Sequence, residues 1–176
     1  MVNSKVSLIA KICIVAVVLF LLPAFVFAEQ PSYGFHTGDR EFTLSGSGSS
    51  DHSLRRTDFT TSLSLGYFFT DNFEGALRQD IGINDREGSS WNGATTLAID
   101  YHFNLGRVQP LIGASAGYVY GDRIKDQWVA GPEAGVKVFI NQTTFVRALI
   151  QYEFPVTESF LSDGRFIYGL GLGVRF

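Results

Sequence analysis

The chain has little cysteine, little charge and no long apolar run in its main part, and each shortage excludes a class of protein. A single cysteine, Cys13, among 176 residues excludes a disulfide framework and a cysteine-rich metal site. Charged residues make up 18%, below the roughly 25% usual for soluble domains. The formal net charge is −3 and there is no basic block, so nucleic acid has no electrostatic footprint to bind. After residue 28, no segment is apolar for the roughly 20 residues that a membrane-spanning helix needs.

The first 28 residues have the pattern of a secretory signal peptide. Lys5 and Lys11 precede an apolar run, residues 12–22, that is too short to cross a bilayer as a helix. The small residues Val26 and Ala28 then fit a signal-peptidase site. We therefore predict cleavage after Ala28, which also removes the only cysteine. The alternative is an uncleaved N-terminal anchor.

The remainder is rich in glycine and phenylalanine, with 19 and 16 residues in the whole chain, and it alternates between two kinds of side chain. Period two is the pattern of a strand with two different faces. In the last strand every second residue is large and apolar, and most residues between them are glycine. The apolar set is Phe166, Tyr168, Leu170, Leu172, Val174 and Phe176. A face of glycines suits the cramped interior of a narrow barrel.

Seven further segments continue the alternation, so the sequence predicts eight strands. They are expected over residues 40–48, 58–69, 73–82, 97–104, 109–120, 133–140 and 146–154, before the last strand at 166–176. Three connections are tight, at 70–72, 104–107 and 141–142, and four are longer and polar, at 49–55, 84–92, 121–127 and 155–165. Short turns at one end and long loops at the other are typical of outer-membrane barrels.

The predicted fold is therefore all-β, an eight-stranded antiparallel up-and-down transmembrane β-barrel over residues 40–176. Residues 1–28 are the cleaved signal peptide and residues 29–39 a short periplasmic tail. An even number of strands places both termini on the periplasmic side. Aromatic residues near both strand ends are consistent with two interfacial belts, although aromatic rings also favour strands in general.

Two segments, VQPLIGASAGY at residues 108–118 and YGLGLGVRF at residues 168–176, make the chain resemble the outer-membrane β-barrel family of small opacity-type surface proteins. The first is a glycine-rich strand. The second is the ending, which is similar to the terminal signal read by the barrel-assembly machinery. In that ending the alternation is carried by Tyr168, Leu170, Leu172, Val174 and Phe176. The resemblance covers nearly all of the mature part, and it implies a fold and an outer-membrane location more than an activity.

Inward side chains are predicted to fill a lumen this narrow. The inward charged set is Glu41, Asp58, Glu74, Arg78, Asp80, Asp100, Glu133, Lys137, Arg147, Glu153 and Arg175, with His102 among them. Because an isolated buried charge is very costly, these groups are expected to pair. Our hypothesis is that the four bases pair with the acids and plug the barrel. The alternative is a proton or small-ion path that uses the acidic excess.

Catalytic and cofactor motifs are weak throughout. The run Asp51-His52-Ser53 has the residue types of a triad, but three consecutive residues do not converge as nucleophile, base and orienter. His102 is followed by Phe103 and lacks the context that lipid A deacylases carry. The three histidines have no metal-ligand spacing, and no phosphate loop or dinucleotide fingerprint occurs. We predict no enzyme, no cofactor and no metal site, with a lipid A-modifying enzyme or a narrow ion or solute conduit as the alternative.

The outer loops remain as the candidate functional part. Arg86, Trp91, Arg123 and Lys125 lie in or near loops of mixed charge, and they are candidates for contacting lipopolysaccharide phosphates or an extracellular partner. The alternative is that these residues are only solvated loop tips.

The sequence thus predicts a small integral outer-membrane protein that acts as a structural or surface-interaction protein. Its expected partners are outer-membrane lipid, lipopolysaccharide and, during biogenesis, the barrel-assembly machinery. A soluble periplasmic barrel, with the outward residues of the last strand covered by protein, is a further alternative.

Overall fold

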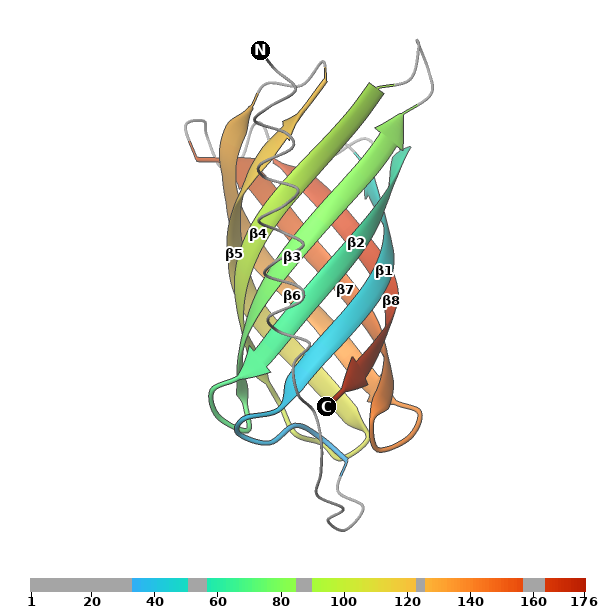
Figure 1. Ribbon diagram of the computed structural model, residues 1–176. Helices are drawn as coiled ribbons and strands as arrows, with labels where there is room; N and C mark the ends of the chain where they lie inside the picture. Colours follow the sequence, from blue (N-terminus) through green and yellow to red (C-terminus); the bar gives the residue numbers. More distant parts are fainter. Residues whose placement is uncertain (1–32, 51–56, 85–89, 123–125, 157–163) are drawn as a thin grey trace. The chain divides into compact units, whose positions relative to one another are not determined.

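The computed structural model describes residues 33–50, 57–84, 90–122, 126–156 and 164–176 (Figure 1). Contacts divide the chain into two units, Met1–Gln30 and Pro31–Phe176, and all described residues belong to the second. The predicted signal peptide lies outside the described residues. Among the described residues, no helix is long and apolar enough to cross a membrane.

The second unit is a closed barrel of antiparallel strands in which each strand pairs with its neighbours along the chain. The strands are β1 (Arg40–Ser50), β2 (Thr57–Phe68), β3 (Phe73–Asn84), β4 (Ser90–His102), β5 (Val108–Gly121), β6 (Gln127–Phe139), β7 (Thr144–Pro155) and β8 (Arg165–Arg175). The barrel closes where β8 pairs with β1, with Leu172 opposite Leu44. The predicted eight-stranded antiparallel β-barrel is confirmed.

Several strands extend further than the alternation indicates. The loop expected at 84–92 is shorter, because β3 runs through Asn84 and β4 begins at Ser90, with Ile83 opposite Trp91. Likewise, β6 begins at Gln127, six residues before the predicted start. In these segments, apolar and polar residues do not alternate clearly, so the sequence pattern does not predict a strand. The backbone hydrogen bonds between neighbouring strands nevertheless continue through them.

The two ends of the barrel differ, and we call them the turn end and the loop end. The turn end carries the short connections after β2, β4 and β6, together with the C-terminal Phe176 (Figure 1). The turn after β6 is held by Asn141, whose Oδ1 accepts hydrogen bonds from the backbone N–H of Thr143 at 2.9 Å and of Thr144 at 2.8 Å. The loop end carries the connections after β1, β3, β5 and β7.

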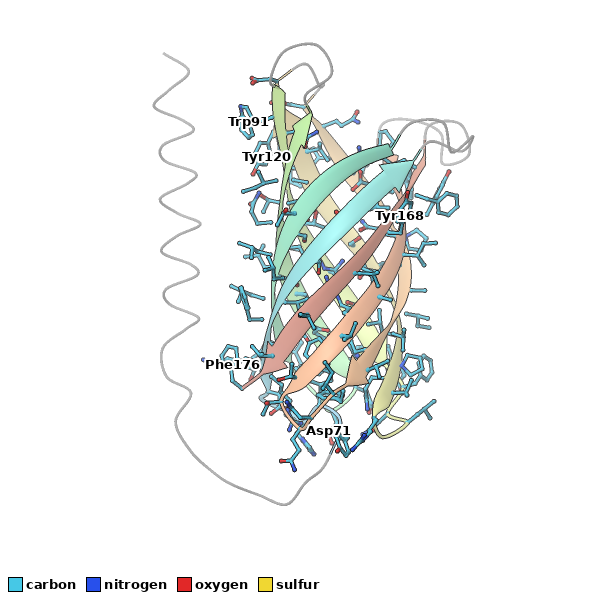
Figure 2. All side chains as sticks on the ribbon, turned by 90° about the vertical axis from the view of Figure 1, so that its right-hand side faces the viewer. Asp71, Trp91, Tyr120, Tyr168 and Phe176 are labelled. Carbon is cyan, nitrogen blue, oxygen red and sulfur yellow. The ribbon has the colours of Figure 1, made fainter. Side chains whose placement is uncertain are left out.

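The exterior of the barrel is apolar and the interior is polar. Outward side chains such as Leu97, Ile99 and Leu170 expose about two thirds of their surface, at 65%, 66% and 67%. Inward side chains such as Glu41 and Lys137 are fully buried. Figure 2 shows the outward side chains standing away from the barrel wall along its length. The period-two alternation of the sequence thus separates the two faces.

Candidate functional site

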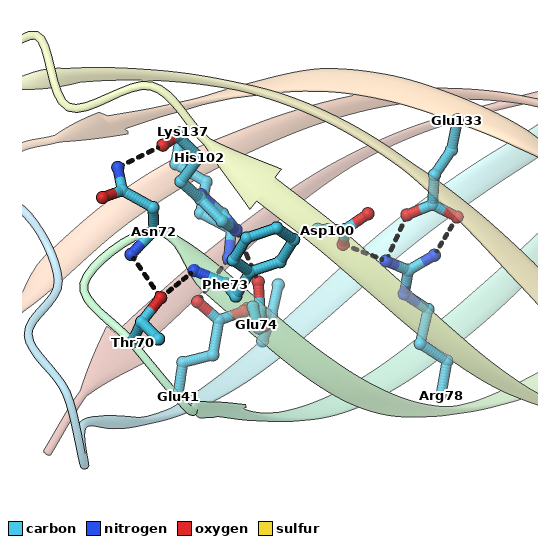
Figure 3. Close-up of polar contacts among 11 residues, drawn as sticks. Glu41, Thr70, Asn72, Phe73, Glu74, Arg78, Asp100, His102, Glu133 and Lys137 are labelled. Carbon is cyan, nitrogen blue, oxygen red and sulfur yellow. Dashed lines mark hydrogen bonds and ion pairs between the residues drawn. The ribbon is translucent and has the colours of Figure 1, made fainter.

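A first ion cluster fills the lumen near the turn end. The Lys137 ammonium donates to Glu41 Oε2 at 2.5 Å and to Glu74 Oε2 at 2.8 Å (Figure 3). His102 Nε2 lies 2.8 Å from the same Glu74 oxygen. The four side chains come from β6, β1, β3 and β4, and each is at most 1% exposed. One buried base is therefore shared by two acids from different strands.

A second ion cluster lies next to the first along the barrel axis. Arg78 on β3 binds Glu133 on β6 through two parallel hydrogen bonds, Nη1 to Oε2 at 2.7 Å and Nη2 to Oε1 at 2.6 Å. Its Nη2 also lies 3.1 Å from Asp100 Oδ2. This fork-to-fork geometry is the strongest form of the arginine–carboxylate pair. It joins strands on opposite sides of the barrel across the lumen (Figure 3).

Inward glycines make room for these carboxylates. A Cβ at Gly66 would lie 2.0 Å from Glu74 Oε1, and a Cβ at Gly113 would lie 2.0 Å from Asp100 Oδ1. No side chain fits at such distances without moving the acid. The glycine-rich inner face is therefore complementary in shape to the ion clusters.

A cluster of four phenylalanines closes the lumen at the turn end. Phe35 from the N-terminal tail packs with Phe68, Phe139 and Phe145. Phe68 is the last residue of β2, Phe139 the last of β6 and Phe145 the second of β7. The rings of Phe35 and Phe68 stack with centroids 4.0 Å apart and an interplanar angle of 8°. Lys137 Nζ lies 4.8 Å from the centroid of the Phe35 ring, within the range of a cation–π contact.

The sequence prediction missed this aromatic cluster. It treated residues 29–39 as a tail outside the barrel and assigned no role to Phe35. One signal was present in the sequence. At the strand ends, three phenylalanines each lie two residues from an inward-facing residue of the same strand, so they face inward too: Phe68 beside Gly66, Phe139 beside Lys137 and Phe145 beside Arg147. Three large apolar groups that point into a polar lumen require an apolar partner.

The lumen toward the loop end is less densely packed. A cavity of about 40 Å³ is lined by the hydroxyl-bearing Ser45, Ser47 and Ser62 and by the charged Arg78, Asp80 and Arg147, among others. Arg147 donates one long hydrogen bond, 3.4 Å, to Ser45 Oγ. Among the described residues, no carboxylate lies within ion-pair distance of Arg147. A polar cavity of this size has room for ordered water.

Two of the predicted lumen bases do not pair as expected. Arg147 has no described acid as a partner, as above. Arg175 lies 3.4 Å from Asp39 of the tail instead of pairing with a lumen acid. Glu153, in turn, pairs with Arg165 at the loop end at 2.5 Å, and the sequence prediction did not consider that residue. Glu153 and Arg165 are register partners on β7 and β8, and Asp39 lies two residues before Glu41, the register partner of Arg175. Both pairs are therefore set by neighbouring strands and not by contacts across the lumen.

The predicted site residues lie in three kinds of place: in the lumen, on the outer surface of a strand, and outside the described residues. Glu41, Glu74, Arg78, Asp100, Glu133, Lys137, Arg147 and Glu153 are buried in the lumen, and Asp80 and Arg175 are half-buried. Trp91 is exposed on β4, not in a loop, and its ring lies edge-on to Tyr120 with centroids 6.1 Å apart. The Asp58 side chain, Arg86, Arg123, Lys125 and the run 51–53 lie outside the described residues.

Three buried groups have a spacing that could suit a metal ion. One donor atom each from Glu74, Asp100 and His102 lies within 4.8 Å of the others. However, one oxygen of Glu74 binds Lys137 and one of Asp100 binds Arg78. Their second oxygens lie against Gly66 and Gly113. Each carboxylate thus has one oxygen on a cation of the protein, whereas Glu74 Oε1, Asp100 Oδ1 and His102 Nδ1 are buried without a hydrogen-bond partner among the described residues.

Comparison with known proteins gives a match in fold only. No protein-family model and no curated protein matches the chain. Among solved structures, the N-terminal β-barrel domain of OprF from Pseudomonas aeruginosa is 20% identical, with a TM-score of 0.60, over 80% of this chain and 98% of that one. The chain has the fold of the small eight-stranded outer-membrane β-barrels.

Two further structures of that class show the same similarity. The outer membrane protein OprG from Pseudomonas aeruginosa is 16% identical, with a TM-score of 0.59, over 81% of this chain and 98% of that one. Neisserial surface protein A (NspA) is 16% identical, with a TM-score of 0.56, over 78% of this chain and 94% of that one. The small barrel described here therefore matches these barrels over nearly their whole length.

Proposed function

We propose that this protein is an integral protein of a bacterial outer membrane whose barrel is a sealed scaffold and whose outer loops make the functional contacts. The observation that carries the proposal is the reversal of the usual polarity. Leu170, Leu172 and Val174 on β8 stand exposed on the outside, while Glu41 and Lys137 are buried inside. Exposure of those apolar side chains to water is unfavourable, whereas their contact with bilayer hydrocarbon carries no such cost.

Aromatic side chains support a membrane position for both ends of the barrel. Figure 2 places Trp91 and Tyr120 near the loop end and Phe176 at the turn end. Phe73 and Tyr101 form an edge-to-face pair near the turn end, with centroids 5.1 Å apart. Aromatic rings prefer the two interfaces of a bilayer. In this proposal the turn end and both termini face the periplasm, and the loop end faces outward.

The lumen contents favour a closed scaffold over a pore. From the turn end, a solute would meet the phenylalanine cluster, then the Lys137 cluster, then the Arg78 cluster. The cavity near the loop end holds about 40 Å³, enough for a few waters. An eight-stranded barrel whose interior is filled by side chains is the expected outcome for this strand number.

The finer parts of the proposal concern biogenesis and contacts. Residues 1–28 would direct secretion, and the last strand, through its alternation from Tyr168 to Phe176, would be read by the barrel-assembly machinery. The loops carrying Arg86, Arg123 and Lys125 would contact lipopolysaccharide phosphates or an extracellular partner. A surface role is consistent with the names of two proteins of similar fold, Neisserial surface protein A and the attachment invasion locus protein of Yersinia pestis.

Planar-bilayer recording of the refolded mature chain tests the sealed barrel. We expect no stable channels of nanosiemens scale, because three layers of side chains block the lumen. A triple variant, Phe35→Ala with Arg78→Ala and Lys137→Ala, provides the comparison, since it removes one large side chain from each layer. Stable large channels formed by the unaltered chain would contradict the proposal.

A further inference from the structure

The N-terminal segment Tyr33–Asp39 is bound to the turn end by a dense set of contacts. Phe35 is 1% exposed, and its ring stacks on Phe68 and lies edge-on to Phe145, with centroids 5.6 Å apart. Thr37 donates two hydrogen bonds to Asp71 Oδ1, from its backbone N–H at 2.7 Å and from its hydroxyl at 2.8 Å. The segment thus inserts one side chain into the lumen and anchors beside it.

Further contacts fix the backbone of the segment. Arg175 near the C-terminus donates to the carbonyl of Gly34, and Arg107 donates to the Tyr33 hydroxyl. The backbone N–H of Gly38 donates to the carbonyl of Phe68 at 2.8 Å. Gly34 and Gly38 have φ angles of +111° and +93°, a conformation that other residues rarely adopt. The two glycines let the chain turn into the lumen and out again.

The binding site for the segment is assembled from strands spread around the whole barrel. Phe68 ends β2, His102 ends β4, Phe139 ends β6, Phe145 is the second residue of β7 and Arg175 ends β8. No two or three adjacent strands supply the complete site. It exists only when the sheet has closed, because closure brings β8 next to β1.

From this geometry we propose that residues 33–39 form a closure latch: a tethered ligand that docks on the completed barrel and holds it shut. A ligand that binds only the folded state stabilises that state, and a tether raises its effective concentration. The docked segment also covers the Lys137 cluster, since the Phe35 ring lies over the Lys137 ammonium. The latch therefore keeps water from the buried ion pairs as well as securing the β1–β8 seam.

The rates of folding and unfolding of the mature chain in detergent micelles test the latch. Contacts formed after the transition state affect unfolding alone, whereas contacts formed before it affect folding. We expect Phe35→Ala to speed unfolding by at least about tenfold and to change the folding rate by less than about twofold. The matched control is Phe145→Ala, which removes a ring from the same cluster but lies on a strand.

A second variant keeps the test independent of the lumen. Thr37→Val removes the hydrogen bond from the Thr37 hydroxyl to Asp71 at an exposed position, so the barrel itself is unaffected. We expect unfolding to become about twofold to fivefold faster, with folding unchanged. The proposal is overturned if Phe35→Ala slows folding by more than about twofold, or if neither Phe35→Ala nor Thr37→Val speeds unfolding.

Discussion

The two halves of the lumen are built differently. Toward the turn end, four phenylalanines and two ion clusters fill the interior, and Lys137 and Arg78 each bind two carboxylates. Toward the loop end, serine hydroxyls surround a cavity of about 40 Å³. Its lining includes Arg147, the fourth residue of β7 from the turn end, which has one long hydrogen bond of 3.4 Å. The difference indicates that ion pairs across the lumen hold the barrel together mainly toward the turn end.

Replacing a base that binds two acids and a base that only lines the cavity gives the largest expected contrast. Lys137→Met leaves Glu41 and Glu74 buried without their shared partner, so the free energy of unfolding should fall by about 3–5 kcal/mol. Arg147→Met removes a base with no described acid beside it, and the change should be within about 1 kcal/mol. Urea titration in micelles measures both. Equal losses in the two variants would remove the distinction between the ion clusters and the cavity lining.

A glycine from each half gives a smaller contrast. Gly66→Ala places a Cβ 2.0 Å from Glu74 Oε1, so it should lower the free energy of unfolding by about 1–3 kcal/mol. Gly169 lies next to Ser47, and its nearest neighbour to an added Cβ is at 3.5 Å, an ordinary contact. Gly169→Ala should therefore be neutral or stabilise by about 0.5 kcal/mol. If Gly66→Ala is tolerated equally well, the fit between glycines and carboxylates is not needed.

Acidification should weaken the binding of the closure latch to the turn end, and this effect should be the smallest of those predicted. The hydrogen bonds from the hydroxyl and backbone N–H of Thr37 hold the pKa of Asp71 below its ordinary value, and the nearby His36 acts in the same direction. Because the pKa is lower in the folded state, the contribution of Asp71 is complete above about pH 4 and is lost as the pH falls through the lowered pKa.

Exchange of the Thr37 amide proton, followed by NMR in micelles, reports this change. In the unaltered chain, protection of that amide should decrease below about pH 4. Asp71→Asn should show weaker protection at pH 7 and little further change on acidification. Protection that falls equally in both chains would assign the effect to another group.

The sequence predicts the faces of the barrel far better than its internal partners. The alternation in the last strand places Leu170 on the outer face and Gly171 on the inner face, whatever residues lie across the lumen. The outward face can therefore be predicted from the sequence of a single strand. The pairing of Lys137 with Glu41 joins residues 96 positions apart and depends on how strands are staggered. Arg175 pairs instead with Asp39 of the tail, which lies two residues before Glu41, the register partner of Arg175.

The closure latch could not be predicted from the sequence, for a different reason. Phe35 follows Gly34 and precedes His36, outside any alternating segment, so no periodic pattern marks it as buried. Its environment is made by the ends of four strands and becomes visible only when the sheet closes. Docked tails of this kind need tertiary structure to be recognised.

The central claim, that alternate side chains face hydrocarbon and a closed interior, is tested most directly by spin labels on β8. The predicted mature chain has no cysteine, so single variants Leu170→Cys, Leu172→Cys and Ile167→Cys carry one label each. In bilayers, labels at 170 and 172 should meet lipid-soluble oxygen readily and a charged nickel chelate hardly at all, whereas the label at the inward position 167 should meet oxygen less. Labels at 170 and 172 that react freely with the nickel chelate, or with neither reagent, would contradict the account.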